Sequence, residues 1–177
     1  MARGAASSSG RRRDPVAAGF DPASIPTAAV GPTAAMDDPL LLENQLCFPL
    51  YACAKGIVAK YKPFLDPLGL TYTQYIAMMV LWERKKLNVK ALGAALLLDS
   101  GTLTPLLKKL EERGLVSRER SPEDERNLVV SITAKGERLK RRAALVPGRI
   151  GSCLGISLEE AKLLYSLLYK MIASVYP

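Results

Sequence analysis

The chain has 177 residues, 49% of them apolar, which fits one domain of ordinary size together with a tail. Its 25 Lys and Arg residues outnumber 17 Asp and Glu, and the net charge of +8 favours a polyanionic partner such as nucleic acid. Histidine is absent, which excludes Ser-His and Cys-His nucleophile pairs, HExxH zinc sites and zinc fingers of the Cys/His type.

Residues 1–35 differ in composition from the rest of the chain. They are rich in Ala, Gly, Ser and Pro, contain the cluster Arg11 to Arg13 and lack aliphatic periodicity, so we predict a disordered tail. Met36 precedes the first periodic segment and is an alternative translation start, in which case the tail is not made. The functional alternative is an arginine arm that touches DNA. We predict one domain over residues 36–177.

We expect a cytoplasmic protein that does not enter a membrane. A signal peptide needs an uninterrupted apolar stretch after its arginines, and Asp14 and Pro22 interrupt the stretch here. The densest apolar run, Ile76 to Trp82, has seven residues, against about 18 to 20 needed to span a bilayer. The three cysteines form no CxxC pair, so structural disulfides of an exported protein are not expected. They are either inert core residues or redox-active.

The first periodic segment predicts a helix that begins near Leu41. Apolar residues recur at three-to-four spacing until Pro63 and Pro67 end the segment. Pro49 lies inside it, removes the hydrogen bond to the carbonyl of Gln45, and is predicted to bend the helix unless the first turn is irregular.

Cys47 lies within about the first two turns of this helix. A cysteine in an apolar segment is more often a small buried hydrophobe than a reactive group. Free backbone amides at a helix N-terminus nevertheless stabilise a thiolate, and Tyr51, at i+4, shares the face of Cys47 and can donate its hydroxyl. Cys53 lies about 240° further around the helix, so we expect it to be inert packing.

The central part of the chain predicts a helix-turn-helix. Thr71 and Gln74 form a capping box for a second helix, and Asn88 caps a third. Asp99 caps a fourth helix with a buried leucine face, which Gly114 ends.

A wing and two more helices follow. Two short β-runs, Leu115 to Arg118 and Leu128 to Thr133, are joined by a polar loop with a turn-forming proline. Further helices are predicted at about 134–146 and 157–175, the last opening on a capping box. The predicted fold is mainly α with a small β-hairpin: a winged helix-turn-helix flanked by N- and C-terminal dimerisation helices.

One face of the fourth helix and the wing suit DNA. Short hydroxyls near a helix N-terminus reach base edges in the major groove, lysines further along suit phosphates, and wing arginines enter an A·T-rich minor groove. The alternative is a merely solvated polar surface. The candidates are Ser100, Thr102, Thr104, Lys108 and Lys109 on the helix, and Arg118, Arg120 and Arg126 on the wing.

Three stretches carry a family resemblance that runs from about Leu41 to Tyr176: LCFPLYACAK, YKPFLDPLGLTYTQYIAMMVLWE and LDSGTLTPLLKKLEERGLVSRERSPEDERN. The sequence resembles the OhrR branch of the MarR family, repressors that respond to organic hydroperoxides. The resemblance implies a homodimer on palindromic double-stranded operator DNA, with an organic hydroperoxide as inducer. It makes Asp124 and Arg126 the wing pair, in which the arginine meets DNA and the aspartate orients it.

The resemblance also assigns a redox site. Tyr61 and Tyr72 match the tyrosines that hydrogen-bond the reactive cysteine from the partner subunit, which makes Cys47 the sensor. Cys153, in the Gly-rich stretch Gly148 to Gly155, matches the resolving cysteine of two-cysteine members; an incidental loop cysteine is the alternative. The resemblance then implies that Cys47 is oxidised and forms a disulfide with Cys153 of the partner chain. This disulfide would change the separation of the two recognition helices, which must match one DNA turn of about 34 to 36 Å for the repressor to bind.

Two other functions remain open. A thiol peroxidase would use the same two cysteines, but it has no need of a helix-turn-helix and a wing, so an enzyme is not expected. A MarR-type repressor of small aromatic ligands would leave the cysteines idle and line a cavity with the tyrosines. No cofactor or metal is expected in any of these interpretations.

Overall fold

A computed structural model describes residues 40–120 and 127–176, and the chain separates into two units, residues 1–51 and 52–177. The predicted tail, residues 1–35, the alternative start at Met36, and the wing residues Asp124 and Arg126 lie outside the described residues. In the first unit, a short 3-10 helix, η2 (Leu42–Asn44), precedes the start of α1. Among the described residues, no helix is both long and apolar enough to cross a membrane.

Helix α1 (Cys47–Leu65) begins later than its apolar pattern predicts. Pro49 therefore lies in the first turn, where amides have no partner within the helix, and Phe48 N donates to Gln45 O at 3.2 Å. The first turn is irregular in this way, which is the alternative to a bend at Pro49 that the sequence left open. Pro63 does not end the helix either, because it removes one hydrogen bond near a C-terminus that the buried Leu65 holds in the core.

The second, third and fourth helices start where their capping residues predict. In front of α2 (Tyr72–Arg84), both hydrogen bonds of the Thr71–Gln74 capping box form. Asn88 accepts from Ala91 N and caps α3 (Val89–Leu96). Helix α4 (Ser100–Glu112) is the predicted fourth helix.

Helix α4 ends in a Schellman motif. Gly114 has φ +68°, its N–H donates to Glu111 O at 2.7 Å, and Leu115 N–H donates to Leu110 O at 3.0 Å. This left-handed conformation suits glycine, as the sequence predicts.

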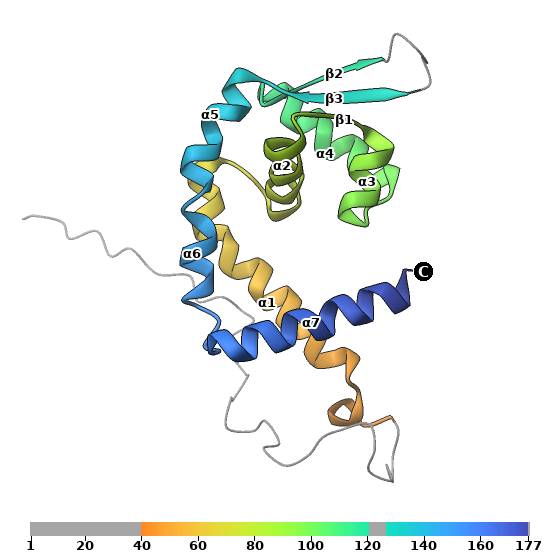
Figure 1. The fold of residues 1–177 in the computed structure, drawn as a ribbon, viewed down its shortest axis with the longest axis vertical. Helices are drawn as coiled ribbons and strands as arrows, with labels where there is room; N and C mark the ends of the chain where they lie inside the picture. The colour runs from red at the N-terminus through yellow and green to blue at the C-terminus, as the bar shows by residue number, and fades with distance from the viewer. Residues whose placement is uncertain (1–39, 121–126, 177) are drawn as a thin grey trace, which may run out of the picture. The chain divides into compact units, whose positions relative to one another are not determined.

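Three antiparallel strands form the wing sheet, in the order β1-β3-β2 (Figure 1). The hairpin strands are β2 (Val116–Arg120) and β3 (Leu128–Ile132), within two residues of the predicted bounds. Thr133 leaves the strand because its hydroxyl caps α5, accepting from Gly136 N. Strand β1 (Lys86–Asn88) pairs with β3 and was not predicted, since three residues carry no alternating pattern.

The C-terminal region contains three helices rather than the two predicted. Helix α5 (Ala134–Ala143) ends three residues early, and α6 (Val146–Gly151) occupies much of the segment predicted as a Gly-rich loop. Its buried side chains, Val146 and Ile150, lie four residues apart on one helical face, which the glycines around them obscured. Helix α7 (Leu158–Val175) opens on the predicted Ser157–Glu160 capping box.

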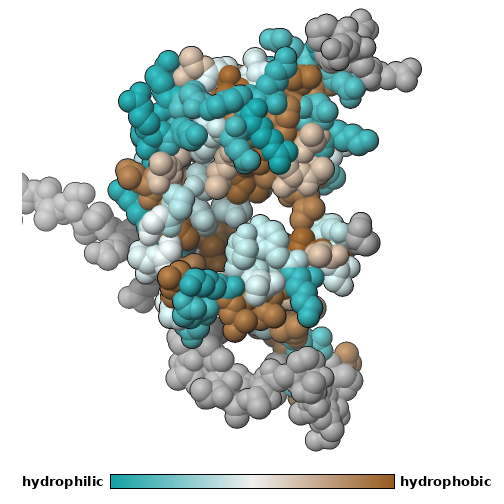
Figure 2. Space-filling view, viewed as in Figure 1, coloured by the Kyte–Doolittle hydropathy of each residue, from teal (hydrophilic) through white to brown (hydrophobic). Residues whose placement is uncertain are grey.

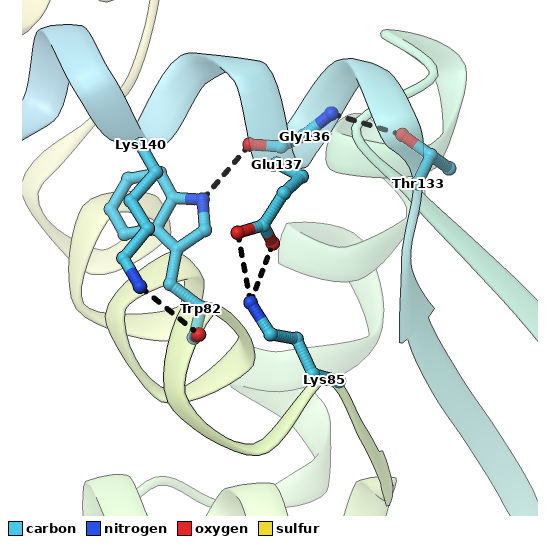
Figure 3. Close-up of polar contacts among 6 residues, drawn as sticks. All are labelled: Trp82, Lys85, Thr133, Gly136, Glu137 and Lys140. Carbon is cyan, nitrogen blue, oxygen red and sulfur yellow. Dashed lines mark hydrogen bonds and ion pairs between the residues drawn. The ribbon is translucent and has the colours of Figure 1, made fainter.

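Helix α5 is fastened to the end of α2 by polar contacts (Figure 3). The buried indole N–H of Trp82 donates to Gly136 O at 2.9 Å. Lys85 pairs with Glu137 at 2.8 Å, and Lys140 Nζ donates to the carbonyl of Trp82 at 3.5 Å. The winged helix and α5 therefore share one core, to which α4 contributes four leucines, α2 contributes residues from Tyr75 to Trp82, and α5 contributes Ala143.

Candidate functional site

The candidate DNA-binding face of α4 is exposed opposite a buried leucine face. Leu103, Leu106, Leu107 and Leu110 are at most 6% exposed, whereas the five predicted contact residues of this helix are all exposed: Ser100, Thr102, Thr104, Lys108 and Lys109. This amphipathic division leaves one whole face of α4 available to a partner.

The N-terminus of α4 is fixed by Asp99. Its carboxylate accepts from Thr102 N–H and from the Thr102 hydroxyl, each at 2.9 Å, and these hydrogen bonds lower the pKa of Asp99. The Thr104 hydroxyl donates to Ser100 O at 2.8 Å. Both threonine hydroxyls thus donate their protons locally, and both residues stay exposed.

Arg118 does not behave as a free wing cation. Its guanidinium donates twice to Glu111 Oε2, at 2.9 and 2.6 Å, and its side chain is only 19% exposed. The hydrogen bonds and charge of Arg118 lower the pKa of Glu111. Arg118 therefore joins β2 to α4, and its contact with DNA stays a prediction. Arg120, at the end of β2, is exposed.

Cys47 and Tyr51 both lie in the first unit, one turn apart at the start of α1. Cys47 is the first residue of the helix and its thiol is exposed, and Tyr51 is 61% exposed. Their i, i+4 spacing places both side chains on the same helical face. The local arrangement of the predicted redox centre is therefore that of an accessible thiol beside a phenol.

Tyr61 and Tyr72 come together in the second unit. Their ring centroids are 4.9 Å apart in an edge-to-face contact, and Tyr61 also lies 6.0 Å from Tyr75. Burial, followed by the proximity of Tyr72, raises the pKa of Tyr61, which keeps its phenol protonated and able to donate. Tyr75 was not predicted; its place one turn after Tyr72 on α2 is the signal that could have identified it.

Cys153 follows α6 in a turn rather than in an open loop. It is exposed, and its thiol donates to Arg149 O at 3.2 Å. The Arg149 guanidinium lies 5.8 Å from the centre of the Phe64 ring, which connects this turn to the end of α1. Cys53 is exposed as well, so in the single chain it is not packed as predicted, and its predicted inertness stays a prediction.

Helix α7 is apolar but has no buried residue. Leu158, Leu163, Tyr165 and Val175 are each more than 60% exposed. A large exposed apolar surface on a helix is typical of a region that another protein chain covers. Among the described residues, no group of three or more Cys, Asp or Glu side chains could hold a metal ion.

Comparisons with known proteins agree with this geometry. Residues 59–143 match the family model described as transcriptional regulator SarA/Rot. The organic hydroperoxide resistance transcriptional regulator of Bacillus subtilis (strain 168) is 48% identical over 139 residues, which cover 78% of this chain and 95% of that protein.

Solved structures share the fold. Reduced AbfR bound to DNA is 34% identical, with a TM-score of 0.64 over 76% of this chain and 94% of that one. A crystal structure of AbfR of Staphylococcus epidermidis is also 34% identical, with a TM-score of 0.63 over 76% of this chain and 92% of that one. AbfR with a disulfide formed is 34% identical, with a TM-score of 0.56 over 76% of this chain and 91% of that one.

Proposed function

This chain belongs to the MarR family of transcriptional regulators, and we propose that it is a repressor that senses organic hydroperoxides by oxidation of Cys47 and then releases its operator. The observation that carries the proposal is the 48% identity with nearly the whole of a regulator named for organic hydroperoxide resistance, in a chain whose Cys47 thiol is exposed. An enzyme is not supported, because the relatives are transcriptional regulators.

DNA recognition is assigned to the exposed face of α4 and to the wing. The hydroxyls near the N-terminus of α4 are proposed to contact base edges, and Lys108 and Lys109 the phosphates. Arg120 and Arg126 are proposed as the basic wing residues, with Asp124 orienting Arg126. A homodimer would present two such faces to the half-sites of a palindromic operator, and the exposed apolar side chains of α7 support a dimer.

The first chemical step is nucleophilic. The Cys47 thiolate attacks one oxygen of the hydroperoxide, the O–O bond breaks, and the alkoxide leaves as an alcohol after taking up a proton. Cys47 is oxidised to a sulfenic acid and the hydroperoxide is reduced. Tyr51 of the same chain, with Tyr61 and Tyr72 of the partner, would stabilise the thiolate by donating hydroxyl protons. Accessibility of Cys47 to a bulky peroxide supports this assignment.

The second step resolves the sulfenic acid. The thiol of Cys153 from the partner chain attacks the sulfenic sulfur, forms an intersubunit disulfide and releases water. The exposure of Cys153 supports this role, and its hydrogen bond to Arg149 O is a single weak contact that is readily broken. A covalent dimer on a non-reducing gel is therefore expected after oxidation. Cys53→Ser should leave this dimer intact, whereas either Cys47→Ser or Cys153→Ser should abolish it.

The test of the function uses an operator selected from a random DNA pool by the reduced protein. Fluorescence anisotropy of the labelled operator is followed while one equivalent of cumene hydroperoxide is added. Wild type and Cys53→Ser should bind and then release the DNA. Cys47→Ser should bind equally well and stay bound. Release by Cys47→Ser at the wild-type dose would overturn the proposal.

A further inference from the structure

A basic cleft lies at the end of α4 remote from the N-terminal hydroxyls of the candidate DNA-binding face. It has a volume of about 450 Å³ and opens between the 3-10 helix η3 (Asp66–Leu68), the C-terminus of α4 and helix α5. Four cationic side chains line it: Arg113, Lys135, Arg138 and Arg142. Figure 2 shows hydrophilic residues gathered over the region that α5 occupies in Figure 1.

Carboxylates in the part of the chain that the structure describes do not neutralise the charge of this cleft. Asp66 is the one carboxylate in its lining, and it is already paired with Lys62 at 2.8 Å. Within residues 40–120 and 127–176, no carboxylate forms a salt bridge with any of the four lining cations. Four like charges around one cleft repel one another, and a bound anion would relieve that repulsion.

Backbone carbonyls hold three of these four cations in place without removing their charge. Arg113 donates to Leu68 O at 3.1 Å, Lys135 to Arg113 O at 2.6 Å, and Arg142 to Pro67 O at 2.8 Å. Each of these hydrogen bonds uses one donor, and a guanidinium has five. The remaining donors are therefore oriented before any ligand arrives, which lowers the entropy lost on binding.

Gly69 makes room for the most enclosed of these cations. It has φ +66°, and a Cβ at this position would overlap the guanidinium of Arg113. The absence of a side chain lets the planar guanidinium lie against the backbone and reach Leu68 O. Arg113 is therefore held as a wall of the cleft.

We propose that this cleft binds a small molecule bearing phosphate groups with two or more negative charges. Guanidinium groups match phosphate oxygens with paired hydrogen bonds, and the volume lies in the range of small-molecule sites, about 300 to 1,000 Å³. Arg113 lies 13 residues after Ser100, which corresponds to about 20 Å along α4 at roughly 1.5 Å per residue. This separation places the cleft away from the proposed base contacts, but Lys109, which is proposed to contact phosphates, lies only four residues before Arg113, about 6 Å along the helix. The operator backbone is therefore the rival occupant, and the operator measurement below distinguishes it from a free ligand.

Isothermal titration of the full-length, reduced protein with inorganic pyrophosphate at low ionic strength tests the proposal, since salt screens exposed charges. Arg138→Gln and Arg142→Gln each remove one lining cation and should weaken binding about tenfold, as expected for a charge-assisted hydrogen bond. Arg141→Gln is the matched control, because Arg141 lies on α5, is exposed and does not line the cleft. This control should bind pyrophosphate like wild type.

A second measurement separates a small ligand from DNA. The selected operator is extended by ten base pairs at each end, and its affinity is compared between wild type and Arg138→Gln. The proposal predicts equal affinities. It is overturned if wild type binds no pyrophosphate, if Arg141→Gln weakens binding as much as Arg138→Gln, or if Arg138→Gln loses affinity for the extended operator while keeping pyrophosphate binding.

Discussion

Replacing Gly136 with alanine tests whether backbone contact between α5 and the wing sheet holds the two together. A Cβ at this position would overlap the carbonyl oxygen of Leu115 and would lie 2.9 Å from Ile132 Cγ1. The carbonyl of Leu115 is backbone and cannot rotate away as a side chain can, so α5 must move as a unit to remove the overlap. That movement strains the Trp82 hydrogen bond to Gly136 O, 2.9 Å, and the Thr133 N–H bond to Leu115 O, 3.1 Å.

The magnitude follows from three contributions. Overpacking costs about 1 to 3 kcal/mol, and weakening two hydrogen bonds costs about 1 kcal/mol each. Alanine regains about 1 kcal/mol over glycine through helix propensity. The net loss in the free energy of unfolding is therefore about 2 to 4 kcal/mol. For a chain of this size that corresponds to a fall in Tm of roughly 5 to 15 °C.

Thermal unfolding followed by circular dichroism, at one fixed protein concentration because dimerisation contributes to Tm, is the assay. Gly148→Ala is the matched control: Gly148 is in α6, a Cβ there meets nothing within 4 Å, and alanine should be neutral or stabilise by up to about 1 kcal/mol. A Gly136→Ala protein as stable as wild type would refute the close packing of α5 on the sheet.

Three further predictions concern charges and phenols. Arg118 lowers the folded-state pKa of Glu111. The stabilisation by Glu111 is therefore complete above its unfolded pKa, about 4.3, and is lost as pH falls through the lower folded value. The Tm of Glu111→Gln should accordingly fall less than that of wild type as the pH is lowered. Tyr61→Phe should slow peroxide oxidation of the sensor thiol in stopped-flow measurements, and an unchanged rate would exclude this phenol as a donor. Arg126→Ala should weaken operator binding by about 1 to 3 kcal/mol, whereas Lys108→Ala should mainly reduce its salt dependence; equal binding by Arg126→Ala and wild type would remove the wing assignment.

Local capping chemistry made much of the fold predictable. Thr71, Asn88, Asp99 and Ser157 each accept from the amide that their spacing predicts, so four helices start at the expected residues. A cap is read from a few neighbouring residues, and no distant contact is needed to recognise it.

Features that depend on distant partners were missed. Strand β1 exists because three residues pair with β3, more than forty positions away, and its own residues carry no strand pattern. The ion pair of Arg118 likewise depends on Glu111 facing it from α4, which the residue types of the wing do not reveal. The start of α1 at Cys47 was obscured because apolar periodicity continues N-terminal to the helix.

The candidate site divides in the same way. The exposed face of α4 follows from the spacing of its leucines and was predictable residue by residue. The redox assignment rested on family resemblance, since a lone exposed cysteine carries little information by itself. The basic cleft could not be predicted, because one of its cations follows the last turn of α4 and the other three lie along α5. Only the folded chain brings these two segments together.

Mass spectrometry of Cys47 during operator release tests the central claim most directly. Reduced protein bound to labelled operator receives sub-stoichiometric to equimolar organic hydroperoxide, and each sample is divided between anisotropy and peptide analysis with a sulfenic acid trap. The account predicts that the fraction of Cys47 found as trapped sulfenic acid or as a disulfide with Cys153 rises in step with the fraction of DNA released, while Cys53 stays reduced. Release of the operator with Cys47 unmodified would contradict it.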